Sequence, residues 1–216
     1  MDLNEFEIRV NELVAQFPDN RLVRLLEHNE VTMTHYHSLL LMLFHQVQNT
    51  SGSFAMAGAM LPPRMWEARH YLFHHADEEK THWQWILNDL ASTGYKGNDP
   101  REISPPAASA AYIAYGYYVA LRQPIARLAV AAVLEGIGAK HGKVYALRLG
   151  KVLNLRPDQL QFFLGHGDTD VGHTQEIFEV LGKSQLSREE WRLMGEAAST
   201  AAVLYRAMYD AAVSEA

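Results

Sequence analysis

Apolar residues recur at intervals of three and four along most of this chain, which is the spacing of one face of an α-helix. No segment of useful length alternates apolar and polar residues as a half-buried strand would. Nothing marks a linker between two cores. The pattern therefore predicts one all-α domain over residues 1–216, a helical bundle of about seven or eight helices.

Local signals place most of these helices. Helices are predicted over residues 3–17, 21–28, from Thr32 or Thr34 to about Gln48, 63–90, 107–122 and 124–153. The segment 49–53 is predicted to break the chain, and residues 95–106, with three prolines, form the longest loop. Another helix reaches about Leu181, and Ser187 with Glu190 predicts a capping box for a last helix that runs nearly to the C-terminus.

Composition narrows the class of protein. The 216 residues are 48% hydrophobic, enough for an ample core, and the net charge of −6 disfavours nucleic acid or an anionic membrane as partner. There is no cysteine, which excludes thiolate ligands and cysteine nucleophiles. The N-terminus does not resemble a secretory signal, and the apolar stretch Ile125–Ala139 is too short to span a bilayer. We expect a cytoplasmic protein.

Two segments carry one chemical pattern, a histidine, a carboxylate four positions on and a second histidine three further. They are His75-x3-Glu79-x2-His82 and His166-x3-Asp170-x2-His173. On a helix these positions share a face. Imidazole and carboxylate ligands suit a non-haem iron or manganese centre, and di-metal carboxylate bundles take Glu-x-x-His motifs from two helices.

Each motif also has an interpretation without metal. Residues 77–80 could be a solvated helical patch, with Glu78 at its edge as a second-choice ligand. The second motif could be a loop in which Asp168 caps the helix that follows, leaving His166 outside it. Three glycines in that segment (Gly165, Gly167 and Gly172) disfavour a helix by roughly 1 kcal/mol each, so they indicate a close backbone approach.

Glu135 is a third candidate ligand. It stands in the apolar run from Leu128 to Gly138, and no cation occurs three or four positions away. A carboxylate in such a helix either binds a metal or pairs across the core. Arg122, Arg127 and Lys143 are the cations available for a salt bridge.

These residues resemble a known superfamily. The series Glu135, His166, Asp170 and His173, after a helix whose motif ends at His82, is similar to the heme-oxygenase-like di-iron oxidases and oxygenases. The stretch from Glu78 to Gly94 also looks like bacterial proteins described as iron-containing redox enzymes. The fold includes pyrroloquinoline-quinone synthase, thiaminase II and a chlamydial protein that makes p-aminobenzoate. The resemblance covers roughly residues 28–181 and implies a heme-oxygenase-like bundle.

Carried over residue by residue, the resemblance assigns Glu135, Asp170 and His173 to one iron and His82 and His166 to the other. Some members have a glutamate where this chain has His75, and others use the position of Glu79. Members also often draw a carboxylate from an earlier helix, where this chain offers His45 or, less plausibly, Glu30. This departure leaves two metal ions, one ion or none as alternatives.

The resemblance implies an iron-dependent oxidoreductase that uses O2, with two irons per chain or manganese in their place, bridged by Glu135 or Asp170. The expected substrate is a small amine- or carboxylate-bearing metabolite, with Tyr115, Lys143 and Tyr145 as weaker candidates for binding it. A homodimer is a candidate assembly. Nucleic acid and membrane are not expected partners.

Other members of the fold offer alternatives. Thiaminase II is excluded because it needs a cysteine nucleophile. A heme oxygenase would take its proximal histidine from His28, His35, His37 or His45. A metal-free oxidase similar to the quinone synthase would use His82, Glu135, His166 and His173 for substrate and O2. In a non-catalytic helical binding protein the same residues would be buried hydrogen-bonded pairs.

Overall fold

The computed structural model describes residues 1–214, apart from the side chains of residues 168–171. All regular secondary structure in that part of the chain is helical, as predicted. Nine α-helices are present in it: α1 (Leu3–Gln16), α2 (Arg21–Glu27), α3 (Met33–Met60), α4 (Trp66–Glu79), α5 (Trp83–Ser92), α6 (Ala107–Arg122), α7 (Arg127–Leu153), α8 (Gln161–Lys183) and α9 (Arg188–Ser214). Short 3-10 turns precede four of them, at Pro63–Met65, Pro100–Glu102, Pro124–Ala126 and Pro157–Gln159.

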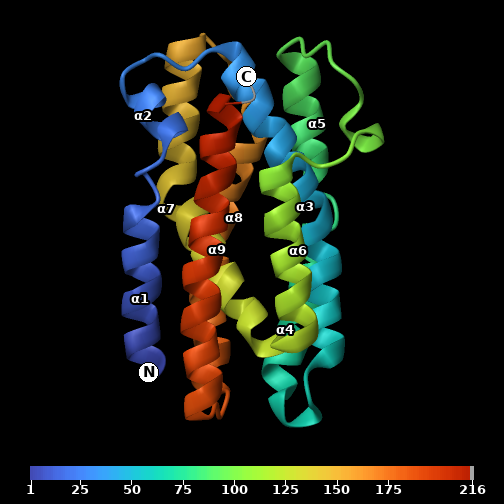
Figure 1. Ribbon diagram of the computed structural model, residues 1–216, viewed down its shortest axis with the longest axis vertical. Helices are drawn as coiled ribbons and strands as arrows, with labels where there is room; N and C mark the ends of the chain where they lie inside the picture. Colours follow the sequence, from blue (N-terminus) through green and yellow to red (C-terminus); the bar gives the residue numbers. More distant parts are fainter. Residues whose placement is uncertain (215–216) are drawn as a thin grey trace.

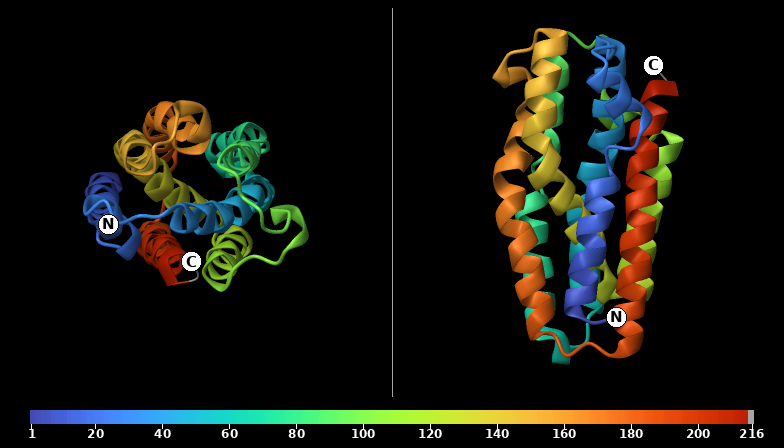
Figure 2. Two further views of the ribbon diagram at one scale, coloured as in Figure 1. Left: turned by 90° about the horizontal axis from the view of Figure 1, so that it is seen from above. Right: turned by 90° about the vertical axis from the view of Figure 1, so that its left-hand side faces the viewer.

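The long helices run along the long axis of the molecule and form a bundle when seen end-on (Figures 1 and 2). Helix α7 packs along α8, and α3 packs against α4 on one side and α6 on another. The first two turns of α7, residues 127–133, are buried without interruption. A helix that is buried all round lies in the interior of its domain, so side chains from these turns face the centre of the bundle.

Two of the predicted elements are confirmed in detail. Helix α6 covers the residues expected of it. At the start of α9, the Glu190 backbone N–H donates to Ser187 Oγ at 3.2 Å, and the Ser187 N–H donates to Glu190 Oε2 at 2.7 Å. The sequence pattern is sufficient where local capping chemistry decides the boundary.

The predicted break at residues 49–53 is wrong, because α3 continues through it to Met60. The polar side chains there bond to the helix itself, with Thr50 Oγ1 donating to the Gln46 carbonyl and Ser53 Oγ to the Thr50 carbonyl. Phe54 is fully buried just beyond. Tertiary packing therefore overrides the low helix propensity of this segment.

The single helix predicted over residues 63–90 is also wrong. Helix α4 ends at Glu79, and α5 begins at Trp83 after a turn. The Trp83 indole N–H donates to the Lys80 carbonyl at 2.9 Å, which satisfies a backbone group released by the break. His82 consequently does not share one continuous helix face with His75 and Glu79. Because the predicted helix is split in two, the described part of the chain has nine α-helices and not the predicted seven or eight.

Glycines allow α8 to lie close to its neighbours. A Cβ on Gly167 would come within 3.1 Å of the Lys143 backbone nitrogen on α7, and one on Gly165 within 2.9 Å of the Trp85 ring on α5. Gly172 has open space around it. The predicted close approach thus holds for Gly165 and Gly167, and it brings α8 against the helix that carries Glu135.

A side chain of helix α5 caps the N-terminus of helix α8. Its first residues donate to the buried carboxylate of Asp89 on α5, Gln161 N–H to Oδ1 at 2.8 Å and Phe162 N–H to Oδ2 at 3.0 Å. This contact fixes the start of α8 relative to α5. Of the helices described, none combines the length and apolarity that crossing a membrane would require.

Candidate metal centre

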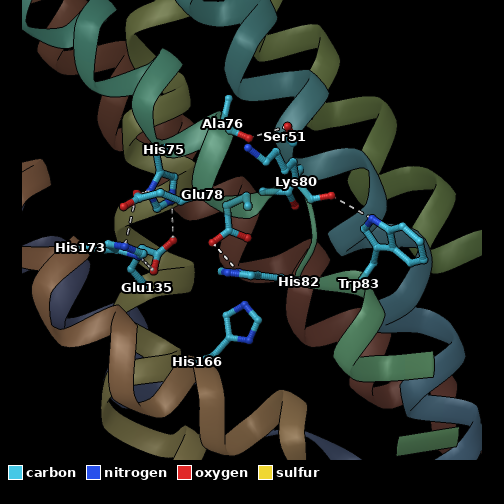
Figure 3. A network of polar contacts seen from close by, with 12 residues as sticks. Ser51, His75, Ala76, Glu78, Lys80, His82, Trp83, Glu135, His166 and His173 are labelled. Carbon is cyan, nitrogen blue, oxygen red and sulfur yellow. Dashed lines mark hydrogen bonds and ion pairs between the residues drawn. The ribbon is translucent and has the colours of Figure 1, made fainter. Parts of the chain in front are cut away.

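The candidate ligands converge from the end of α4, the turn after it, α7 and α8 (Figure 3). Four residues form a first group: His75, Glu79, Glu135 and His173 each offer a ligand atom within 4.8 Å of the others. Glu79, His82 and His166 form a second group by the same measure. Glu79 belongs to both, so the two groups share one carboxylate.

Glu135 is the centre of the first group. His75 Nε2 lies 3.2 Å from its Oε1, and His173 Nδ1 lies 3.3 Å from its Oε2. Burial raises the pKa of Glu135, but the hydrogen bonds from His173 and His75 outweigh it, and the net pKa is well below the usual range. Burial lowers the pKa of His173, but the bond to Glu135 dominates and raises it. The carboxylate is therefore ionised and available as a ligand.

The second group is held by ring contacts. His82 stacks on Trp85, with ring centroids 4.2 Å apart, and its ring meets that of His166 edge-on at 5.0 Å. His166 Nδ1 is 3.0 Å from the Phe162 carbonyl, which assigns the proton to Nδ1 and leaves Nε2 with its lone pair. Burial lowers the pKa of His166, so the imidazole is neutral, the form that binds metals.

Buried nitrogen atoms without partners test whether the residues fit a metal. Nδ1 of His75 has no hydrogen-bond partner, although the ring is fully buried. Nδ1 of His82 is 3.0 Å from Glu79 Oε1 but is not aligned to bond to it. An unsatisfied buried polar atom costs about 1–3 kcal/mol. With imidazole and carboxylate donors and no thiolate, the residues fit a divalent first-row metal.

The structure brings together six of the seven metal ligands named from the sequence: His75, Glu79, His82, Glu135, His166 and His173. The seventh, Asp170, lies outside the described residues. Glu78 lies at the rim, with Oε2 3.5 Å from His75 Nδ1 and 3.6 Å from His173 Nε2. Its side chain is 38% exposed, so it faces the group from the solvent side.

The alternatives for Glu135 and for an earlier-helix ligand resolve differently. Glu135 pairs with the two histidines and not with Arg122, Arg127 or Lys143, so the salt-bridge alternative is wrong. His45 is buried on α3, and its Nε2 has no partner, but it belongs to neither ligand group. Glu30 is exposed in the connection between α2 and α3. The described residues supply no carboxylate from an earlier helix.

A cavity adjoins both groups. The centre of a water molecule can occupy a volume of about 60 Å³ in this cavity. This volume is enough for several waters or for part of a small ligand. Its lining includes Glu79, Glu135 and His166 together with Gln46, Thr50, Phe54, Arg127, Ala131 and Tyr145. Of the residues proposed to bind substrate, Tyr145 lines this cavity, whereas Tyr115 and Lys143 do not belong to its described lining.

The geometry agrees with a comparison of sequences. Residues 39–207 match the family of iron-containing redox enzymes with a heme-oxygenase-like fold. Because the match covers well over half of the chain, this protein belongs to that family. No curated protein matches the chain significantly.

Solved structures show the same fold. A domain of unknown function with a heme oxygenase-like fold from Shewanella denitrificans is 23% identical, with a TM-score of 0.88 over 100% of this chain and 93% of its own. A TenA homolog from Pseudomonas syringae pv. tomato is 12% identical (TM-score 0.81; 98% and 92% covered). Heme oxygenase-1 from Synechocystis, in complex with heme, is 16% identical (TM-score 0.75; 97% and 91% covered). At these identities the likeness establishes the fold alone.

Proposed function

We propose that this member of the iron-containing redox family is an O2-activating, non-haem di-iron oxidase or oxygenase that acts on a small amine- or carboxylate-bearing metabolite. The observation that carries the proposal is the sharing of Glu79 by two groups of ligand atoms. A carboxylate has two oxygen atoms and can serve two ions at once, whereas an imidazole ring facing a site offers one nitrogen. Glu79 is thus the natural bridge.

In this assignment His75, Glu135 and His173 would hold one ion with Glu79, and His82 and His166 would hold the other. The bridging role passes from Glu135 or Asp170, as inferred from the resemblance, to Glu79. Iron in such a ligand set supplies the electrons that reduce O2. The protein's own contribution is to keep the His166 imidazole neutral, to hold Glu135 ionised and to present these residues to a cavity that has room for a few water molecules.

The other functions of this fold find less support in the described residues. The candidate proximal haem ligands, His28, His35, His37 and His45, do not belong to the described lining of the cavity. His35 instead belongs to the capping box of α3, and His37 bonds to Thr93. For a metal-free oxidase or a binding protein, the buried Nδ1 of His75, which has no hydrogen-bond partner among the described residues, would carry an uncompensated cost.

Iron content and O2 consumption test the proposal. The purified chain is stripped with a chelator, reloaded anaerobically with Fe(II), desalted and analysed for metal. We expect about two irons per chain and a transient visible absorption on exposure to O2. Glu79→Gln should hold less than one iron, whereas Glu67→Gln, an exposed glutamate on the same helix, should load like the unmodified chain. Full loading of Glu79→Gln would overturn the assignment of the bridge.

A further inference from the structure

Arg127, the first residue of α7, is a buried cation that has no counterion among the described side chains. Its residue exposure is 3%. The guanidinium carbon lies 3.8 Å from the centre of the Phe54 ring, and Nε donates to Ser53 Oγ at 3.1 Å. Nη1 has no hydrogen-bond partner, and Arg127 forms no salt bridge with any carboxylate described in the structure.

Such a residue is costly unless something else balances it. Moving a charge out of water costs several kcal/mol even after the surroundings relax, and the contact with an aromatic ring returns only about 2 kcal/mol. Burial accordingly lowers the pKa of Arg127, while the negative charges of Glu135 and Glu79 act in the opposite direction. An arginine nevertheless keeps its charge in proteins. The guanidinium therefore carries a charge that no described carboxylate contacts.

The position of Arg127 indicates where that anion lies. Arg127, Ala131 and Glu135 are spaced four residues apart on one face of α7, and all three line the same cavity. The eight steps from Arg127 to Glu135 advance about 12 Å along the helix. Ala131, between them, is small and leaves space. Arg127 and Glu135 thus line one cavity from positions about two helical turns apart.

The surroundings of Arg127 add polar groups that suit an anion. Gln46 lines the same cavity, and its amide has a second N–H besides the one that it donates to Thr50 Oγ1. A smaller hollow behind is also lined by Arg127, Gln46 and Thr50, together with Tyr112, whose buried hydroxyl has no partner. One guanidinium with neutral hydrogen-bonding neighbours matches a single negative charge better than a doubly charged phosphate.

We infer that Arg127 binds the carboxylate of the substrate and that the apolar body of the substrate extends past Phe54 and Ala131 towards Glu79 and Glu135. This inference rests on the proposed function and narrows its substrate class from amine- or carboxylate-bearing molecules to monocarboxylates with an apolar or aromatic body. It also assigns substrate binding to a residue that the sequence offered only as a salt-bridge partner, in place of Lys143.

Binding of matched carboxylates and amides tests the inference. The probes are the ω-phenyl carboxylates from benzoate to 5-phenylpentanoate and the primary amide of each, titrated by calorimetry into the metal-free and the iron-loaded full-length chain. We expect at least one carboxylate to bind about 10- to 100-fold more tightly than its amide, the range of a hydrogen-bonded charge pair. Equal binding of every pair, or no binding by any carboxylate, would overturn the inference.

Variants then locate the preference. Arg127→Met keeps the length and apolar bulk of the side chain and should reduce carboxylate binding to the level of the amide. Arg122→Met, which changes an exposed arginine at the end of α6, should leave the preference intact. Arg127→Lys retains the charge and should keep part of the preference, which provides a second measurement if the methionine variant fails to fold by circular dichroism. A preference that survives in folded Arg127→Met contradicts the inference.

The test separates the inference from the proposed function. Iron loading and O2 consumption are measured on the same samples without a probe. A chain that binds carboxylates through Arg127 in its metal-free form but takes up no iron refutes the di-iron proposal and retains the anion site. A chain that loads two irons and discriminates no carboxylate from its amide retains the di-iron proposal and refutes the anion site.

Discussion

The two histidine–carboxylate–histidine segments have the same spacing but differ in backbone. His166 and His173 stand two turns apart on α8, whereas the first segment is divided between the last turns of α4 and the turn before α5. The break turns His82 towards His166 and leaves His75 beside Glu135, so the first segment contributes to both ligand groups. The comparison teaches that equal spacing predicts the kinds of ligand, while the backbone decides which ligand is shared.

Removing the shared carboxylate should have the largest effect. Glu79→Ala is expected to abolish loading of both irons, because each group loses a ligand. His166→Ala should reduce the iron content from about two per chain to about one. The measurement is iron per chain after anaerobic loading. Equal losses in the two variants would break the distinction between a shared ligand and an unshared one.

The close approach of α8 to α7 supports the second segment, and filling it should destabilise the bundle. Gly167→Ala introduces a Cβ within 3.1 Å of a backbone nitrogen and 2.7 Å of a side-chain carbon of Lys143, and we expect a loss of about 1–3 kcal/mol in the free energy of unfolding. Gly172→Ala, in open space on the same helix, should instead gain up to about 1 kcal/mol. Urea unfolding of both variants gives the comparison. Similar values for the two would show that α8 is free to shift.

The cap that Asp89 provides should make stability depend on pH. Burial raises the pKa of Asp89 to about 6 from 3.8, against the two backbone hydrogen bonds that lower it. A raised folded-state pKa means that the protonated form is favoured by folding. Protonated Asp89 therefore adds about 1–3 kcal/mol to the free energy of unfolding. This contribution is complete below about pH 4 and is lost as the pH rises through about 6.

Asp89→Asn should flatten this dependence between pH 4 and 7, as measured by urea unfolding at several pH values. Asp2→Asn is the matched control, because Asp2 caps α1 from an exposed position. The same slope in Asp89→Asn and the unmodified chain would mean that another group titrates.

Tyr145→Phe should have the smallest effect. The Tyr145 hydroxyl is buried at the cavity without a hydrogen-bond partner, so its removal should change the free energy of unfolding by less than about 1 kcal/mol and leave iron content unchanged. Weaker binding of a substrate-like carboxylate in this variant would assign the hydroxyl to substrate. A large loss of stability would reveal a partner for it in the folded chain.

The sequence was sufficient for features that depend on local chemistry. The extent of α6, the capping box of Ser187 and Glu190 and the residue types of the candidate ligands all follow from spacing and composition. The continuation of α3 through Thr50 and Ser53 could not be predicted, because it depends on how the helix packs in the bundle. The break after Glu79 could not be predicted either, since no proline or glycine marks it, and with it the sharing of Glu79 was missed.

Arg127 shows the same limit from another side. In the sequence it is one of several cations near Glu135, and its charge suggested a salt bridge. Only the three-dimensional structure shows that Glu135 is already paired with two histidines and that the guanidinium of Arg127 lines the cavity with no carboxylate partner among the described residues. Which charged groups pair depends on which of them the fold brings into contact, and the spacing of residues in one sequence does not contain that information.

The turn between α4 and α5 also affects the local opening of the backbone. An ion held by Glu79, His82 and His166 would link α4, the turn and α8, and a second ion would also link α7. Release of both ions would therefore remove the links among these four segments. The turn between α4 and α5 should then open locally, and it should open faster in the metal-free chain. Amide hydrogen exchange at residues 80–84 would report metal occupancy directly, without any substrate.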